Sequence, residues 1–372
     1  MTDLERVKAT LDHKSPDKLP ASIGTTIVDG MTIYAKNRYE VYKGVEHTED
    51  VFTHLAMRTV MTPAWICDRI GTEFGSVNMT GPFMDTTEFE ADGSYYDEFG
   101  IYWKKSEMYI DPVCGPIKHL DEYTDTDVKK CPWPSAYDKG RVQGIRDKAL
   151  ALKAQGKAVV ANIMCGGPFE QSCWTRGMEN FLCDMYVNPK GAEALLDRIT
   201  QSAIEFWDVY LTEIGDLATV VCQGDDVGMQ DRAFMSREMY DKFIFKYHKR
   251  LFSFIKSKTN AKIFLHSCGS VYELLPGLIE AGVEILNPIQ VTAKNMNIER
   301  LKSDFGSELV FWGGIDVQRL LPFGKPQQIK DEVHRVCDMF ACGGYVLAPS
   351  HNLQNYVPEE NIDALITAMA ER

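Results

Sequence analysis

The segment AKIFLHSCGS, residues 261–270, joins a short apolar strand to a polar turn, and this pattern decides the fold because it recurs along the chain. Further apolar runs rich in β-branched residues predict strands of the same kind. Together with 261–265, the predicted strands are 158–164, 218–222, 284–286, 309–312 and 345–348. Their apolar character is continuous rather than alternating, which is typical of parallel strands buried on both faces.

The segments between these strands carry helix start signals. Pro189, Pro326 and Pro358 stand where a first helical turn is expected, and proline is favoured there because its missing N–H would have no partner anyway. Strands that alternate with helices predict an α/β barrel or a doubly wound sheet. No GxGxxG follows the first strand and no GxxxxGK[ST] occurs, so nucleotide-binding doubly wound sheets lose their support. We therefore predict a (β/α)8 TIM barrel.

The N-terminal part of the chain is less regular. Residues 19–23 predict a first strand, and 110–120 predict a further strand or a hairpin. Two glycine-containing turn signals within 88–102 predict a β-hairpin insertion. The charged segment 1–14 is an amphipathic N-terminal extension, with apolar residues at helical spacing: Leu4, Val7 and Leu11. No linker-like stretch separates the two halves, so we expect a single domain, 1–372.

Composition excludes several classes of function. The formal net charge of −13, without any basic cluster, argues against a nucleic-acid partner. No apolar run approaches the roughly 20 residues that span a membrane, and the N-terminus lacks the apolar core of a signal peptide. The ten cysteines are scattered and form no CxxC pair, so a disulfide framework is not expected. The sequence therefore predicts a cytoplasmic protein.

The sharpest chemical signal is His266-x-Cys268, at the end of the predicted strand 261–265. Barrel enzymes carry their working residues at the C-terminal ends of strands. Residues i and i+2 of an extended segment point to the same side, so this imidazole and this thiolate can converge on one ion. The pair suits Zn²⁺. The alternative is a buried histidine beside an inert cysteine.

A catalytic zinc needs about three protein ligands and an open position. His351 lies just beyond the C-terminal end of the predicted strand 345–348, on the same face of the barrel as His266. Cys342 precedes that strand, which places it at the opposite, N-terminal face. The barrel geometry therefore favours His351 as the third ligand, and Cys342 as a structural residue.

Other strand ends supply candidate catalytic and substrate-binding residues. Asp225 and Asp226 follow strand 218–222, and we expect them to have separate roles because adjacent side chains point in different directions. One would support the substrate or the metal, and the other would cap a loop or helix; two solvated loop acids are the alternative. Candidate substrate-binding residues at the mouth and in an apolar pocket are Trp174, Gln290, Trp312, Asn352 and Tyr356. For the aromatic ones, a place in the core is the alternative.

Four blocks of sequence carry a resemblance to a known family. They read GGPF at 166–169, FLHSCG at 264–269, WGGID at 312–316 and GGYVLAP at 343–349. In this order and spacing they resemble the uroporphyrinogen decarboxylase superfamily from about residue 158 to the end. True decarboxylases of that superfamily carry an arginine-rich N-terminal block that grips porphyrinogen carboxylates. The region around 19–42 contains no arginine before Arg38, so decarboxylation is not expected.

The resemblance instead implies the corrinoid-linked methyltransferases of the superfamily. Those related to coenzyme M methylation bind zinc through a His-x-Cys and a cysteine in a Pro-Gly-Cys stretch. Here His266 and Cys268 match the first part, while Pro349-Ser350-His351 departs from the second and places His351 at the cysteine position. The implied cofactors are Zn²⁺, held by a His/Cys/His set, and a cobalamin carried by a partner corrinoid protein.

The change of ligand favours one substrate class. A site with one thiolate remains a stronger Lewis acid than one with two, which suits the polarisation of a leaving oxygen. The resemblance and this chemistry predict transfer of a methyl group from a methoxylated aromatic, a phenyl methyl ether, to cob(I)alamin. One alternative is a methylcobalamin:thiol methyltransferase of the coenzyme M type, and another is a metal-free tetrapyrrole-binding or decarboxylase-like protein. The expected partners are a corrinoid protein and a small-molecule methyl donor, and a homodimer is compatible with the sequence.

Overall fold

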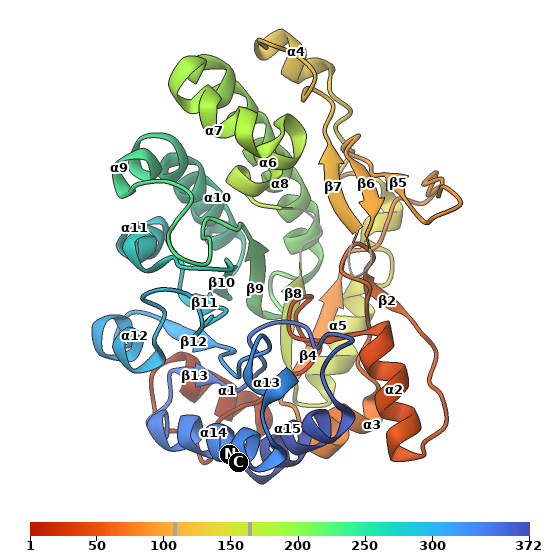
Figure 1. The fold of residues 1–372 in the computed structure, drawn as a ribbon, viewed down its shortest axis with the longest axis vertical. Coiled ribbons are helices and arrows are strands. Elements are labelled where there is room, and N and C mark those ends of the chain that lie inside the picture. The colour runs from red at the N-terminus through yellow and green to blue at the C-terminus, as the bar shows by residue number, and fades with distance from the viewer. Residues whose placement is uncertain (107–109, 163–165) are drawn as a thin grey trace.

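The computed structural model describes residues 1–106, 110–162 and 166–372, and its centre is a curled sheet of parallel strands surrounded by helices (Figure 1). The spatial order of the seven strands is β13-β12-β11-β10-β9-β8-β4, and every neighbouring pair is parallel. The strands are β4 (Phe74–Asn78), β8 (Ala158–Asn162), β9 (Ala218–Gly224), β10 (Lys262–His266), β11 (Ile285–Asn287), β12 (Val310–Trp312) and β13 (Tyr345–Val346). The predicted strand 158–164 is confirmed as far as Asn162; residues 163–165 lie outside the described residues.

The predicted first strand, 19–23, closes the barrel with a single parallel bridge between Ala21 and Leu347. The Ser22 N–H donates to the Leu347 carbonyl at 2.8 Å, and the Leu347 N–H donates to Pro20 at 2.9 Å. On its other side, the Thr72 hydroxyl just before β4 donates to the Ala21 carbonyl at 2.7 Å. This segment therefore occupies the eighth position between β13 and β4, and the fold is the predicted (β/α)8 barrel.

Helices cover the outside of the barrel, and two of them begin at a predicted proline. Pro189 and Pro326 occupy first helical positions, as predicted, whereas Pro358 is the residue just before its helix. The helices that follow barrel strands are α5 (Ile145–Ala154), α6 (Pro168–Arg176), α7 (Met178–Val187), α8 (Pro189–Ile214), α9 (Arg237–Met239), α10 (Phe245–Lys258), α11 (Leu275–Ala281), α12 (Ile298–Phe305), α13 (Leu320–Phe323), α14 (Pro326–Met339) and α15 (Glu359–Glu371). A π-helical turn, Tyr240–Ile244, leads into α10.

The N-terminal extension closes the bottom of the barrel. Helix α1 (Asp3–Leu11) is capped by Thr2, and its Val7 and Leu11 side chains are buried. Both pack into the cluster that fills the barrel interior, together with the inward-facing Phe74, Val160 and Phe264. The amphipathic pattern of segment 1–14 therefore reflects a helix whose apolar face plugs the N-terminal end of the strands.

Two small antiparallel sheets stand outside the barrel. The predicted insertion forms the sheet β5 (Tyr95–Tyr96), β6 (Tyr102–Lys105) and β7 (Ile110–Cys114), so it extends beyond the expected 88–102 and takes up the start of 110–120. A second sheet, which the sequence did not signal, joins β1 (Met31–Thr32), β3 (Thr59–Val60) and β2 (Phe52–His54). The remaining helices of this part are α2 (Ile33–Lys43), α3 (Ala64–Ile70), α4 (Asp125–Lys130) and a 3₁₀ turn, Lys139–Val142.

Among the described residues, no helix combines the length and the apolar character needed to cross a bilayer. The described cysteines are all free thiols.

Candidate metal centre

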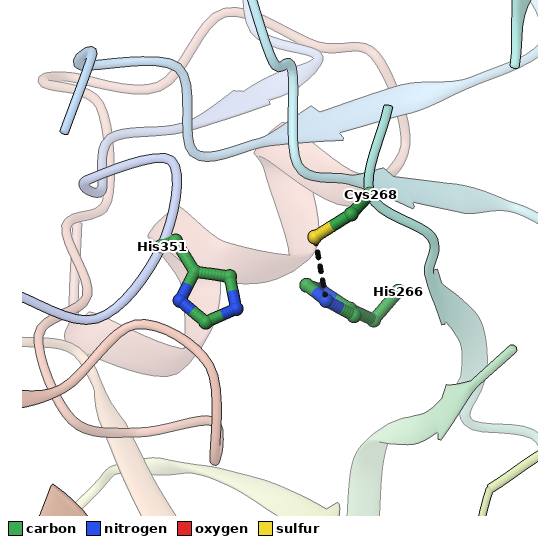
Figure 2. A group of neighbouring side chains, drawn as sticks. All are labelled: His266, Cys268 and His351. Carbon is green, nitrogen blue, oxygen red and sulfur yellow. Dashed lines mark hydrogen bonds between the residues drawn. The ribbon is translucent and has the colours of Figure 1, made fainter. Parts of the chain in front are cut away.

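Three side chains from two distant parts of the chain meet at the C-terminal end of the barrel strands. His266 is the last residue of β10, Cys268 lies in the turn that follows, and His351 follows β13. One potential ligand atom from each lies within 4.8 Å of those from the other two. The Cys268 Sγ is 3.4 Å from the His266 Nε2, and the two imidazole centroids are 5.5 Å apart (Figure 2).

Cys342 lies at the other end of the barrel. It is exposed in the turn between α14 and β13, and the nearby Gly344 N–H donates to the carbonyl of Thr10 in α1. Since α1 plugs the N-terminal end of the strands, the length of the barrel separates Cys342 from His266. The geometry therefore agrees with the choice of His351 over Cys342.

The ring of His266 is held in one orientation by Asn287, the last residue of β11. The Asn287 side-chain amide donates to the Trp312 carbonyl at 2.9 Å, which fixes its Oδ1 as the acceptor for the His266 Nδ1–H at 2.6 Å. The lone pair of the His266 Nε2 then faces the other two side chains. Such an outer hydrogen bond to a ligating imidazole is a regular feature of metal sites, and sequence reasoning gave Asn287 no role beyond marking a strand end.

The charges around the triad favour a bound cation. Burial raises the pKa of the Cys268 thiol well above its usual value, and the carboxyls of Asp226 and Glu170 raise it further. Burial also lowers the pKa of His351 to about 3, and His266 and His54 add to this effect. The His351 imidazole therefore stays neutral, the form that binds metals, while a divalent ion would convert the thiol into a thiolate ligand. The donor set fits a borderline-soft ion such as zinc.

Asp225 and Asp226 occupy different environments. Asp225 is fully buried, and its carboxylate accepts the N–H groups of Phe169 and Glu170 at 3.1 and 2.7 Å. It also accepts from the His248 Nε2 at 2.7 Å. Asp225 thus caps helix α6, whose own N-cap position is a glycine.

Asp226 faces the triad instead. Its Oδ1 accepts the Cys268 N–H at 2.8 Å and lies 3.8 Å from the His266 Nε2. Burial raises the pKa of Asp226, while His266 opposes that effect. The structure therefore gives the two acids separate places, and Asp226 is the one beside the metal ligands.

Glu170, which sequence reasoning did not select, joins this group. Burial and the nearby Asp226 and Asp225 raise the pKa of Glu170 well above its usual value. In the sequence it is only an acid in the first turn of a helix, so nothing local distinguishes it from an ordinary dipole partner. Its place near the triad depends on tertiary structure, because its N–H donates to Asp225, the residue that follows β9.

The five predicted substrate-binding residues do not form one surface. Trp312 is buried in the barrel interior, between Phe74 and Phe264, because it continues the inward alternation of Val310. Asn352 is also fully buried, and it binds the Gly30 N–H at 2.7 Å and the Ile27 carbonyl at 3.1 Å. These two side chains therefore support the site from inside instead of lining an open pocket.

The other three lie nearer the surface. Gln290 accepts the Gly269 N–H at 2.7 Å and so stabilises the turn that carries Cys268. Trp174 packs edge-on against Trp103 of the inserted sheet, with the ring centroids 5.2 Å apart, and lines a cavity of about 310 Å³ between β7 and the helices α6 and α7. Tyr356 is exposed in the loop that follows the triad residue His351.

Comparisons with known proteins agree with this architecture. The sequence pattern of the uroporphyrinogen decarboxylase (URO-D) family matches residues 107–372. A methylated-thiol–coenzyme M methyltransferase of Methanosarcina mazei is 23% identical over 264 residues; the alignment covers 68% of this chain and 65% of that relative, less than two thirds of its length. The solved structure of a methyltransferase from Methanosarcina mazei has the same fold, with a TM-score of 0.66, 17% identity, and coverage of 100% of this chain and 99% of that chain. The matched region contains the whole triad and most of the barrel, and the chain belongs to the uroporphyrinogen decarboxylase family.

Proposed function

We propose that this chain is a zinc-dependent methyltransferase that transfers the methyl group of a methoxylated aromatic compound to the cob(I)alamin of a separate corrinoid protein. In this proposal His266, Cys268 and His351 hold the zinc, and the fourth position is open to the substrate. The relatives support the methyltransferase class, because one matched protein is a methyltransferase that acts with coenzyme M and the chain shares the fold of another.

The composition of the triad is the observation that carries the proposal. One thiolate and two neutral imidazoles compensate only half of the charge of Zn²⁺, so the bound ion would supply a Lewis acid for the oxygen that leaves when a methyl ether is cleaved. A site with two thiolates would be neutral and better suited to binding a thiolate. The low pKa of His351 fits this role, since the ring keeps its lone pair available.

The chain's own residues would prepare the site in two ways. Asn287 fixes the ring of His266 so that its Nε2 points at the metal position, and Asp226 holds the backbone of Cys268. Glu170 and Asp226 place two carboxyls with raised pKa values beside the triad, where a protonated carboxyl can donate a hydrogen bond to a substrate oxygen.

Transfer from a panel of methoxyarenes to cob(I)alamin tests the proposal. The zinc-loaded protein is incubated with each ether and a reduced corrinoid protein, and methylcobalamin is followed by its absorption spectrum. We expect methylation with at least one methoxyarene and release of the matching phenol. If methylated thiols react and no ether does, the substrate class is wrong.

Thiol chemistry is the second candidate, and the relative favours it. The matched Methanosarcina mazei protein is a methylated-thiol–coenzyme M methyltransferase. The same assay separates the two candidates when run in the opposite direction, with methylcobalamin as donor and coenzyme M as acceptor. Formation of methylated coenzyme M at a rate above that with ethers would favour this candidate.

A further inference from the structure

His54 is a titratable side chain beside the triad that is not part of the ligand set. It ends β2, in the hairpin that passes through Met57 to β3. Met57 packs against the cluster inside the barrel, and its sulfur lies 3.6 Å from the side-chain amide of Asn352, the residue after His351. The hairpin therefore lies over the C-terminal end of the strands, where it brings His54 to the metal centre from a part of the chain that forms no barrel strand.

The hydrogen bond of His54 fixes its tautomer. The Met57 N–H lies 3.2 Å from the His54 Nδ1, and because a peptide N–H can only donate, this nitrogen must carry the lone pair. In a neutral ring the proton is then on Nε2. Burial lowers the pKa of His54 to about 4, so the ring is neutral at neutral pH and presents Nε2–H as a donor.

His54 lies near the triad, since its neighbour Met57 contacts Asn352, the residue after His351. His54 is close enough to His351 to contribute to its low pKa, together with His266. Its ring atoms do not belong to the group of ligand atoms that lie within 4.8 Å of one another, so it adjoins the metal position without being a ligand. The residue is only partly buried, and no described residue forms a hydrogen bond with its Nε2. An accessible donor without a protein partner, beside a metal position, is suited to a substrate atom.

We propose that the His54 Nε2–H donates a hydrogen bond to the ether oxygen of the methyl donor. This hydrogen bond becomes stronger as negative charge develops on the leaving oxygen. This inference rests on the proposed function. In the reaction the methyl C–O bond breaks, its electron pair stays on the oxygen, and the methyl group goes to the cobalt of the reduced corrinoid, so His54 keeps its proton throughout. A neutral imidazole is a known stabiliser of developing negative charge on oxygen. Removing one such donor typically costs on the order of 10²–10³-fold in rate.

Three variants test this role in the zinc-loaded protein. His54→Leu removes the donor. His54→Gln restores it, because the amide oxygen can accept from Met57 while the amide nitrogen donates. His334→Ala, at an exposed position of α14, is the control. The readouts are zinc content, the affinity for catechol by calorimetry, and methyl transfer from aryl methyl ethers whose phenols differ in pKa.

We expect His54→Leu to retain zinc, to bind catechol about 10-fold more weakly, and to lose on the order of 10²-fold in transfer rate. The loss should grow as the pKa of the leaving phenol rises, and His54→Gln should recover part of it. If the wild type is active and His54→Leu changes neither the catechol affinity nor the dependence of the rate on the pKa of the leaving phenol, the inference about His54 is wrong. The proposed function would not be affected by that result. Loss of zinc in a folded His54→Gln would also overturn the inference about His54, since His54 would then be a ligand. Failure of the wild type on every ether would overturn the proposed function itself.

Discussion

His351 is the residue on which the identity of the metal centre depends. His266 and Cys268 are two positions apart and must share one side of an extended segment, so their convergence is dictated locally. His351 follows β13, which lies three strands from β10 in the sheet, and the curl of the barrel brings it to them. A third ligand contributed by this curl links the metal site to the integrity of the fold.

We predict that His351→Ala abolishes tight zinc binding, whereas Cys342→Ser leaves it unchanged. Two ligands cannot satisfy a tetrahedral site, so the zinc affinity should fall by several orders of magnitude when the imidazole is removed. Zinc per chain, measured by mass spectrometry after dialysis against a weak chelator, checks this outcome. Should Cys342→Ser lose zinc while His351→Ala keeps it, the ligand assignment is wrong.

The site residues that follow the ends of barrel strands could be predicted from the sequence. Those that reach the site from a helix or from the N-terminal hairpin could not. His266, Cys268 and His351 all follow directly from the rule that barrel chemistry lies at C-terminal strand ends. Glu170 and His54 lie in a helix turn and in an unpredicted hairpin, and the signal that marks them is spatial. Trp312 takes the core position that the sequence left open as the alternative, because an aromatic residue near a strand end can point into the barrel core as readily as into a pocket.

Asp225 connects three parts of the barrel wall. It directly follows β9, caps α6 through two backbone N–H groups, and binds His248 of α10. The His248 Nδ1 in turn lies 3.0 Å from the Tyr240 hydroxyl. The helix starts at Pro189 and Pro326 were predictable from the local sequence. A cap supplied by a residue 55 positions away was not, because it depends on tertiary structure.

We predict that Asp225→Asn and Asp226→Asn impair different properties: the first lowers stability, and the second lowers zinc affinity. The first leaves buried donors without an acceptor, so the free energy of unfolding should fall by about 2–4 kcal/mol. The second changes a partly exposed side chain that contacts a single N–H, so stability should change by less than about 1 kcal/mol, while zinc affinity falls about 10–100-fold. Urea denaturation and zinc titration measure the two quantities. Equal losses of stability in both variants would contradict the separate roles.

The two ends of the barrel differ: the C-terminal end carries the metal triad, and the N-terminal end is closed by α1. The triad lies at the C-terminal end, where Figure 1 shows the inserted sheet and the helices α6 and α7 on one side of the strands. Helix α1 fills the N-terminal end with Val7 and Leu11, next to a buried ion cluster of Arg6, Glu73 and Arg372. The metal site and the packing of α1 are therefore separated by the length of the barrel.

We predict that Leu11→Ala lowers the free energy of unfolding by about 2–5 kcal/mol without changing zinc affinity. Leu11 is 3% exposed, so its truncation opens a cavity at the base of the barrel, far from the triad. Lys8→Ala, on the exposed face of the same helix, is the matched control and should be nearly neutral. Chemical denaturation and zinc titration check both variants. A loss of zinc affinity in Leu11→Ala equal to that of a ligand variant would show that the two ends are coupled.

We predict that the chain gives no turnover with substrate alone, and that turnover begins when a reduced corrinoid protein is supplied. A methyl group on an ether is a poor electrophile, and the described nucleophile at the site, the Cys268 thiol, is part of the proposed ligand set. The corrinoid domain must approach at the C-terminal end of the strands, near Asp226 and Gln290, and must leave again to be reduced and to pass on the methyl group, so its contact should be small and partly polar. Assays of phenol release with and without the corrinoid protein, under reducing anaerobic conditions, measure this dependence. Ether cleavage by the isolated chain would instead indicate that zinc activates water, because hydrolysis needs no methyl acceptor other than hydroxide.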